Sequence, residues 1–223
     1  MTMKTPILLL NYKTYKESLV RGVEIAKICK RVSKKLKVNI VVAPQYALIK
    51  EIVNIIPTFS QDFDPMEFGS HTGSVLGVGV KRLGVKGSLI NHSEKRLPKR
   101  EIEKRVRACK RLKLISVLCS KNLKESENLA RLKPDFIAIE PPELIGGKVS
   151  VSTAKPSLIK NTVDAVRKVS PKTKVLCGAG IHTSEDVRIS LKLGAKGVLV
   201  ASGIIKASNI EKALKEIASG FTF

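Results

Sequence analysis

The chain has 223 residues, of which 43% are hydrophobic, so it can bury a sizeable core and lacks the composition of a disordered protein. No apolar run approaches the roughly 18 residues that a membrane span needs. The PILLL stretch near the start is too short for a signal peptide and lacks a small-residue cleavage site. We therefore expect a cytoplasmic protein without a membrane partner.

The net charge of +22 allows three interpretations. It can reflect solvated faces of outer helices, steer an anionic substrate or bind nucleic acid non-specifically. The basic residues are densest at 27–37 and 95–113, both on helical patterns, and neither segment interleaves the aromatic residues that stack on bases. The solvated faces are the favoured interpretation, and no specific nucleic-acid partner is expected.

The cysteines are widely spaced and form no C-x-x-C pair, which disfavours a zinc site or a disulfide framework. We expect all four to be reduced and mostly buried: Cys29, Cys109, Cys119 and Cys177.

Apolar runs and helical patterns alternate along the whole chain. The runs predict strands at 6–11, 38–44, 56–60, 85–91, 114–118, 135–140, 174–177 and 197–200. The patterns predict helices at 16–35, 47–53, 99–111, 123–132, 156–169, 184–193 and 209–219. Segment 61–79 is loop-like, with four glycines.

Eight strand units without a linker or a composition break predict one fold, a (β/α)₈ TIM barrel, as a single domain over 1–223. The alternative is an open doubly wound sheet. It is disfavoured because no G-x-G-x-x-G follows the first strand.

Polar residues follow five of the predicted strands, where barrels carry their chemistry. The sets are Asn11 with Lys13, Asn91 to Glu94, Glu140, Gly178 to Gly180, and Ala201 to Gly203. Each set alone has an ordinary structural explanation, and His71 and His182 are interpreted as structural histidines. Their convergence on one rim indicates a site.

Glu140 ends an apolar strand, and an ionised carboxylate there is costly unless it is paired or used. Pro141 and Pro142 stop the strand, and Gly146 and Gly147 give freedom at the far end of the loop. The segment therefore predicts a carboxylate on a rigid strand, followed by a loop that can close.

The combined set has a chemical logic. The glycine turns after the seventh and eighth strands suit a phosphate, and a lysine supplies positive charge. His92 can donate to a carbonyl, and Glu140 can take a proton from the adjacent carbon. No metal-ligand cluster is evident in the sequence. Proton transfer next to a carbonyl of a phosphorylated substrate is the predicted reaction class.

Six motifs in this order resemble the triosephosphate isomerases, in particular the archaeal branch, over roughly residues 6–215. They are N-Y-K (11–13), G-S-H-T-G (69–73), N-H-S-E (91–94), E-P-P-E-L-I-G (140–146), C-G-A-G-I (177–181) and A-S-G (201–203). The resemblance implies interconversion of dihydroxyacetone phosphate and D-glyceraldehyde 3-phosphate in glycolysis and gluconeogenesis, with no cofactor and no metal.

The resemblance also implies roles for individual residues. Glu140 would be the base and His92 a neutral electrophile. Lys13 would balance charge, Asn11 would orient the substrate, and Glu94 would hold the network around Lys13. The phosphate would be bound by Asn11, Lys13, Ile145, Gly146, Gly180, Ala201, Ser202 and Gly203.

The loop that carries Thr72 resembles one that reaches into a neighbouring subunit, so a homo-oligomer is expected, a tetramer rather than a dimer. Two features depart from the family pattern. Lys148 stands at the trailing end of the closing loop, and Gly77 and Gly79 stand where a helix is expected, which puts that helix in doubt.

Two alternatives to this function stay open at this stage. Another phosphosugar isomerase on the same barrel would share the glycine turns but need a different acid–base pair. A basic nucleic-acid-binding protein would bind in a salt-dependent manner and would not need Glu140.

Overall fold

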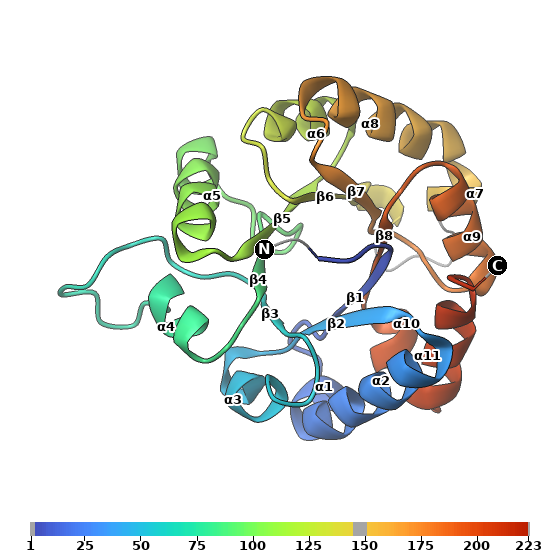
Figure 1. Ribbon diagram of the computed structural model, residues 1–223, viewed down its shortest axis with the longest axis horizontal. Coiled ribbons are helices and arrows are strands. Elements are labelled where there is room, and N and C mark those ends of the chain that lie inside the picture. Colours follow the sequence, from blue (N-terminus) through green and yellow to red (C-terminus); the bar gives the residue numbers. More distant parts are fainter. Residues whose placement is uncertain (1–2, 145–150, 223) are drawn as a thin grey trace.

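A computed structural model describes residues 3–144 and 151–222, in which parallel strands form a barrel surrounded by helices (Figure 1). The strands are β1 Ile7–Asn11, β2 Asn39–Ala43, β3 Phe59–Ser60, β4 Gly87–Ile90, β5 Ile115–Ser120, β6 Phe136–Ile139, β7 Lys174–Cys177 and β8 Gly197–Val200. Each run is apolar because its residues face the barrel interior and the surrounding helices in turn, so both faces are covered.

The strand order is β2-β1-β8-β7-β6-β5-β4-β3, and the two edge strands β2 and β3 meet to close the barrel. Val42 and Thr58 form an isolated parallel bridge there, and the Val42 N–H donates to the Pro57 carbonyl over 3.0 Å. The predicted (β/α)₈ barrel is confirmed. The alternative of an open doubly wound sheet is wrong.

The helices lie outside the barrel and cover its outer face. They are α1 Lys16–Val20, α2 Gly22–Leu36, α3 Ile49–Ile52, α4 Gly77–Arg82, α5 Lys99–Leu112, α6 Leu123–Ala130, α7 Val151–Ala154, α8 Pro156–Val169, α9 Ser184–Lys192, α10 Ser202–Ile205 and α11 Ile210–Ser219. Two 3₁₀ turns, η1 Tyr46–Leu48 and η2 Pro142–Leu144, complete the described elements. None of these helices, within 3–144 and 151–222, is long and apolar enough to cross a membrane.

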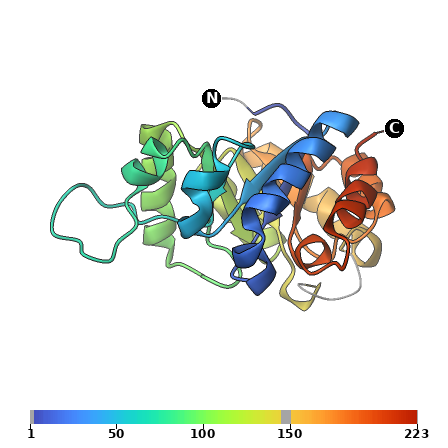
Figure 2. The ribbon, with the colours of Figure 1, turned by 90° about the horizontal axis from the view of Figure 1, so that it is seen from below.

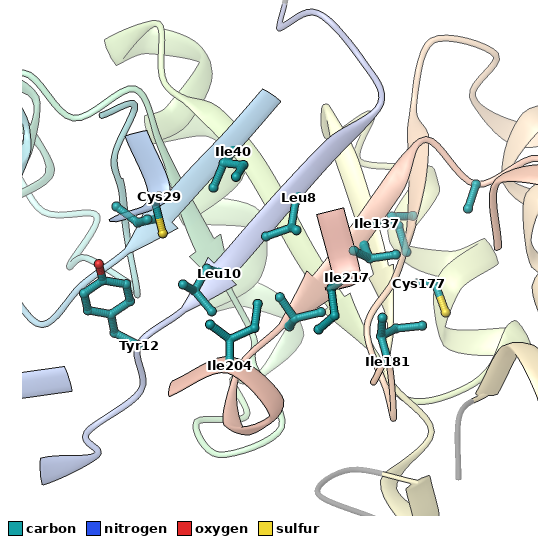
Figure 3. Close-up of a cluster of buried hydrophobic side chains, with 14 of the residues drawn as sticks. Leu8, Leu10, Tyr12, Cys29, Ile40, Ile137, Cys177, Ile181, Ile204 and Ile217 are labelled. Atoms are coloured by element: carbon teal, nitrogen blue, oxygen red, sulfur yellow. The ribbon is translucent and has the colours of Figure 1, made fainter. Parts of the chain in front are cut away.

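The core has two layers, and alternate residues of each strand feed them. Ile7 and Leu9 of β1 belong to the cluster inside the barrel, where they meet Leu89, Val117 and residues of the other strands. Leu8 and Leu10 belong to the larger cluster between strands and helices (Figure 3). This two-sided burial holds the strands rigid, so side chains at their carboxyl ends are fixed in space.

The structure departs from the predicted elements where side chains override the periodicity. The predicted helix 16–35 is two helices, because Arg21 leaves the helical conformation and Gly22 packs against Leu48. The Tyr12 hydroxyl donates to the Gly22 carbonyl over 3.2 Å at this break. The predicted helix 47–53 is η1 followed by the short α3.

Other differences are in length. The predicted strand 56–60 is reduced to Phe59–Ser60. Of the residues before it, Thr58 forms an isolated bridge with Val42 of β2. The helices α7 and α10 and the turn η2 were not predicted, because four or fewer residues carry no periodicity.

Segment 61–79 is loop-like, as expected, except that α4 begins at Gly77, so the doubted helix forms. Asp62 and Phe63 at the start of this segment are buried, and the chain after them projects from the side of the barrel as a long loop (Figures 1 and 2). The two glycines of α4 differ in their surroundings. A Cβ at Gly77 would lie 2.7 Å from the Phe63 ring and 3.0 Å from Leu112, whereas a Cβ at Gly79 would meet nothing within 4 Å.

These surroundings predict opposite effects for two neighbouring substitutions. We expect Gly77→Ala to lower the free energy of unfolding by about 1–3 kcal/mol through overpacking. Gly79→Ala should raise it by roughly 0.5–1 kcal/mol, because alanine loses less backbone entropy in a helix. Urea unfolding of the two variants measures both effects, and a shift in the same direction would contradict the packing of α4 described here.

Candidate active site

The described part of the chain forms a pocket at the carboxyl ends of the strands. It is lined by residues that follow β1, β4, β6, β7 and β8, namely Asn11, Lys13, His92, Glu140, Gly178, Gly180, Ile181, His182, Leu199, Val200, Ala201, Ser202 and Gly203. The structure therefore brings together most of the described residues that the sequence predicted for the site. Glu94 does not line the pocket and adjoins it through its ion pair with Lys13.

His92 and Asn11 present two hydrogen-bond donors side by side. The backbone N–H of Glu94 donates to His92 Nδ1 over 3.3 Å, so the neutral ring carries its proton on Nε2. The backbone N–H of Lys13 donates to Asn11 Oδ1 over 2.9 Å, which leaves the Asn11 amide NH₂ facing His92. The Asn11 Nδ2 and His92 Nε2 atoms lie 3.5 Å apart. Both are donors in this tautomer, so the pair is suited to bind one shared acceptor.

Glu140 is a buried carboxylate, only 3% exposed, directly after β6. Its Oε1 lies 3.5 Å from His92 Nε2, and its Oε2 is buried without a hydrogen-bond partner among the described residues. A buried acceptor without a partner costs roughly 1–3 kcal/mol. The fold therefore keeps one oxygen of this carboxylate without a hydrogen-bond partner among the described residues.

Gly178 and Cys119 lie against Glu140. A Cβ at Gly178 would lie 2.5 Å from Glu140 Cγ and 3.2 Å from the Ile139 carbonyl oxygen, so only glycine leaves room for the glutamate. Burial, followed by the charge of Glu140 and a hydrogen bond to it, raises the pKa of the Cys119 thiol well above its usual value. The thiol therefore stays protonated beside the carboxylate.

Lys13 stands beside the donor pair with its backbone in the left-handed region, at φ 47°. Its Nζ lies 2.8 Å from Glu94 Oε1. Burial lowers the pKa of Lys13, but the hydrogen bond and charge of Glu94, together with the charges of Tyr15 and Glu140, raise it, and the net pKa lies above its usual value. The Gln61 amide donates to the carbonyls of Lys13 and Ala43, over 2.9 and 3.1 Å, and holds the unusual backbone in place.

Backbone peptide groups, rather than polar side chains, form the other end of the pocket. Gly180 has φ 66°, a conformation that favours glycine, and α10 begins at Ser202 directly after β8. The first N–H groups of a helix have no partner within it and can bind an anion. A Cβ at Gly203 would lie 3.2 Å from His182 Nδ1 and 3.6 Å from the Ile181 carbonyl oxygen, so the absence of a side chain leaves room for these neighbours.

The structure places the remaining predicted residues as follows. Thr72 is exposed on the projecting loop, outside the residues that line the pocket. Ile145, Gly146 and Lys148 lie outside the described residues. Among the residues that are described, no group of three or more His, Cys, Asp or Glu side chains can hold a metal ion.

Comparison with known proteins gives consistent matches. The family model described as triosephosphate isomerase matches residues 6–217. The triosephosphate isomerase of Methanocaldococcus jannaschii is 48% identical over 95% of this chain and 98% of its own. Those of Methanothermus fervidus and Methanosarcina barkeri are 48% and 47% identical, each over 96% of this chain and 98% of their own. The chain belongs to the triosephosphate isomerase family.

The resemblance of the six motifs to the triosephosphate isomerases, and to their archaeal branch, is thereby confirmed. The lining residues Gly178, Ile181, His182, Leu199 and Val200 were not predicted to be catalytic or binding residues, and neither was Gln61, which supports the backbone of Lys13. Gly178 belongs to the quoted C-G-A-G-I motif, so its signal was present. Gln61 and His182 carry no local signal, because their roles depend on contacts across strands and on the turn after β7.

The cysteines of this triosephosphate isomerase family member are free and buried, as predicted. Burial raises the pKa of Cys29, Cys109 and Cys177 to about 12. They are therefore uncharged, inert core residues at neutral pH.

Proposed function

We propose that the protein interconverts dihydroxyacetone phosphate and D-glyceraldehyde 3-phosphate, in glycolysis and gluconeogenesis, without a cofactor. Family membership favours this reaction over another phosphosugar isomerisation and over nucleic-acid binding. The observation that carries the proposal is the buried carboxylate of Glu140, whose Oε2 has no hydrogen-bond partner among the described residues and whose Oε1 lies 3.5 Å from His92 Nε2, which in turn lies 3.5 Å from Asn11 Nδ2.

The proton moves between two adjacent carbons. In the direction from the ketone to the aldehyde, the Glu140 carboxylate removes a proton from C1 of dihydroxyacetone phosphate. A C1–C2 double bond forms as the carbonyl electrons move to the oxygen on C2. The proton of the C1 hydroxyl moves to the oxygen on C2, and Glu140 returns a proton to C2 as the carbonyl forms at C1, which gives the aldehyde. The balance needs no oxidant and no added proton, because the product is an isomer of the substrate.

The developing oxyanion is stabilised by groups placed before the reaction. His92 Nε2–H and the Asn11 amide bind the oxygens of the enediolate, and Lys13 supplies positive charge. His92 carries the hydroxyl proton from the oxygen on C1 to the oxygen on C2. A carboxylate base with a neutral histidine is the assignment described for this enzyme family in general.

The phosphate lies at the backbone end of the pocket. Gly180, Ala201, Ser202 and Gly203 contribute peptide N–H groups there, and Asn11 and Lys13 adjoin them. Ile145 and Gly146 are proposed to complete the phosphate site when the loop after β6 closes, as described for the family. Because the phosphate is bound away from the reacting carbons, the groups that give affinity for the substrate differ from the groups that transfer the proton.

The test is a coupled assay of the purified protein with dihydroxyacetone phosphate. We expect saturable turnover that persists in a chelator. Ribulose 5-phosphate serves as the comparison phosphosugar and should not be isomerised. Turnover of the pentose phosphate alone would overturn the assignment of substrate.

We propose further that the protein is a homo-oligomer, a tetramer rather than a dimer. The segment 61–76 supports this, because part of it projects from the barrel as a loop (Figure 2). Within the segment Thr72 is exposed and the Phe68 side chain is 75% exposed. An apolar side chain presented in this way is suited to burial against a second copy.

Light scattering tests the oligomer. We expect a mass of about four chains, and a smaller species with reduced turnover for Phe68→Glu. Fully active monomer of the unmutated protein at micromolar concentration would contradict the proposal.

A cytoplasmic location completes the proposed function. It is supported by the reduced state of four buried cysteines in a chain that has no disulfide among them.

A further inference from the structure

The end of the barrel opposite the candidate active site carries a ring of lysines. In Figure 2 the chain before β1 lies at the upper edge of the molecule, and the yellow segment that follows β6 lies at the lower edge. Seven of the eight strands are preceded, within three residues, by an exposed lysine. Because the barrel is closed, these lysines surround its amino-terminal end. We call them the lysine ring: Lys4, Lys37, Lys86, Lys113, Lys133, Lys172 and Lys196.

Carboxylates are nearly absent from the same end of the barrel. Among the described residues, Asp135 is the one acidic residue that lies between a helix and the strand after it. Its Oδ2 already accepts from the N–H and the hydroxyl of Ser116, both over 2.9 Å. The nearby ion pair of Arg111 with Glu67 uses a cation outside the ring. In the part of the chain that the structure describes, no lysine of the ring is paired with a carboxylate.

Stabilisation of helix ends does not account for the lysine ring. Cations near helix C-termini are favourable, and some reach the free carbonyls there. Lys81 Nζ donates to the Lys113 carbonyl over 3.3 Å, and Lys110 Nζ donates to the Leu132 carbonyl over 2.8 Å. Within residues 3–144 and 151–222, no side chain of the ring makes a bond of this kind. The ammonium groups of the ring are therefore available to an external anion.

A groove beside two lysines of the ring partly encloses this positive charge. It lies between the starts of β7 and β8 and is lined by Arg167, Lys172, Lys174 and Lys196, together with Val163, Pro171, Thr173, Val175 and Gly194. Lys174 is held in place, because its Nζ donates to the Met3 carbonyl over 3.3 Å and lies 5.7 Å from the centre of the Phe136 ring. Cations in a groove with apolar walls focus the electric field and attract anions.

The side chains around the lysine ring favour the backbone of a nucleic acid duplex over a membrane. The large apolar side chains that are exposed among the described residues are Leu19, Val20, Tyr46, Phe68 and Leu83. Of these, Leu83 alone lies in a connection that leads into a strand, so this end offers little to insert into a bilayer. It also presents no exposed aromatic ring for stacking on unpaired bases. A duplex, by contrast, carries one negative charge per roughly 1.7 Å of its axis.

We propose that the lysine ring and the adjoining groove form a binding surface for the phosphodiester backbone of duplex nucleic acid. Binding is independent of base sequence, because contacts to phosphate carry no sequence information. The surface adds a second function to the proposed isomerase and does not depend on it. Because the two sites lie at opposite ends of the barrel, a bound duplex leaves the candidate active site open to its substrate.

Fluorescence anisotropy of a short labelled DNA duplex tests the surface on the full chain. We expect a Kd of about 10⁻⁶–10⁻⁴ M near physiological salt, equal for two unrelated base sequences. The combined variant Lys86→Gln, Lys172→Gln and Lys196→Gln should bind at least about tenfold more weakly. The slope of log K against log salt should fall in magnitude by up to roughly 3, because each phosphate contact contributes about 0.9.

The matched control is the combined variant Lys27→Gln, Lys121→Gln and Lys212→Gln. These three lysines are exposed and lie towards the carboxyl-terminal end of the barrel, in the first halves of α2 and α11 and directly after β5. The control has the same net charge as the ring variant and should bind within about twofold of the unmutated protein, because it keeps every lysine of the ring. Both variants should retain turnover of dihydroxyacetone phosphate.

If circular dichroism shows that the ring variant is unfolded, Lys4→Gln combined with Lys37→Gln takes its place. Absence of binding at low salt would overturn the proposal, and so would equal weakening by the ring variant and the control, because binding would then follow net charge. Displacement of the duplex by glycerol 3-phosphate at constant ionic strength would also overturn it, since the duplex would then occupy the candidate active site.

Two further outcomes separate this surface from other functions. Tighter binding to phosphatidylserine vesicles than to the duplex, lost in the ring variant, would assign the surface to a membrane and overturn the proposal. If the protein does not isomerise dihydroxyacetone phosphate but the ring variant and the control differ as expected, the proposed isomerase function fails and the binding surface stands.

Discussion

Glu140→Gln should lower kcat for dihydroxyacetone phosphate by at least about a thousandfold. A placed general base contributes roughly 10²–10⁴-fold, and Glu140 is the described carboxylate that lines the pocket. The amide keeps the shape of the side chain but has no basic oxygen to take a proton. KM should change little, because the phosphate lies at the backbone end of the pocket, beside Gly180 and Gly203.

Two comparisons make this result specific. Glu140→Asp should be milder yet still severe, because it withdraws the carboxylate by about one methylene and reaction geometry matters at that scale. Glu127→Gln, on the outer helix α6, removes a surface carboxylate and should leave kcat unchanged. A folded Glu140→Gln variant that retains more than about a tenth of kcat would show that Glu140 is not the base.

Gly178→Ala is expected to lower kcat by roughly a hundredfold without touching a reacting group. The new Cβ would lie 2.5 Å from Glu140 Cγ and 3.2 Å from the Ile139 carbonyl oxygen. Backbone cannot yield easily, so the glutamate must turn away, and a displacement of about 1 Å costs on the order of 10²-fold. The loss should fall on kcat more than on KM, because the base moves relative to the substrate.

Gly79→Ala provides the matched control for this variant. It adds the same methyl group at a helix position with no atom within 4 Å, far from the pocket in sequence. Its kcat should equal that of the unmutated protein. Equal kinetics for the two alanine variants would contradict the packing of Glu140 against Gly178.

The barrel was predictable because each strand is apolar throughout. A strand such as β1, whose residues are all buried, leaves no solvent-facing pattern and indicates a sheet covered on both faces. The break at Arg21 and Gly22 was not predictable from helical spacing, because it depends on Leu48, which is distant in sequence. The same holds for α4, where Gly77 is accommodated by Phe63 and Leu112.

The described residues of the predicted site could be named because barrel chemistry gathers at strand ends, where Asn11, His92 and Glu140 stand. Their supports could not be found in this way. Gln61 acts through the backbone carbonyls of Lys13, after β1, and of Ala43, at the end of β2, and Gly178 acts through the absence of a side chain. Such contributions depend on contacts between strands, and strand order is a property of the closed barrel.

The central claim is that Glu140 carries a proton between two carbons of a triose phosphate. Isomerisation of dihydroxyacetone phosphate in D₂O, followed by NMR, tests it most directly. The account predicts that part of the D-glyceraldehyde 3-phosphate carries deuterium at C2, because a proton held on a carboxylate exchanges with solvent, and that Glu140→Gln forms essentially no labelled product. Rapid product formation with no deuterium in product or recovered substrate would indicate a direct hydrogen shift and would contradict the account.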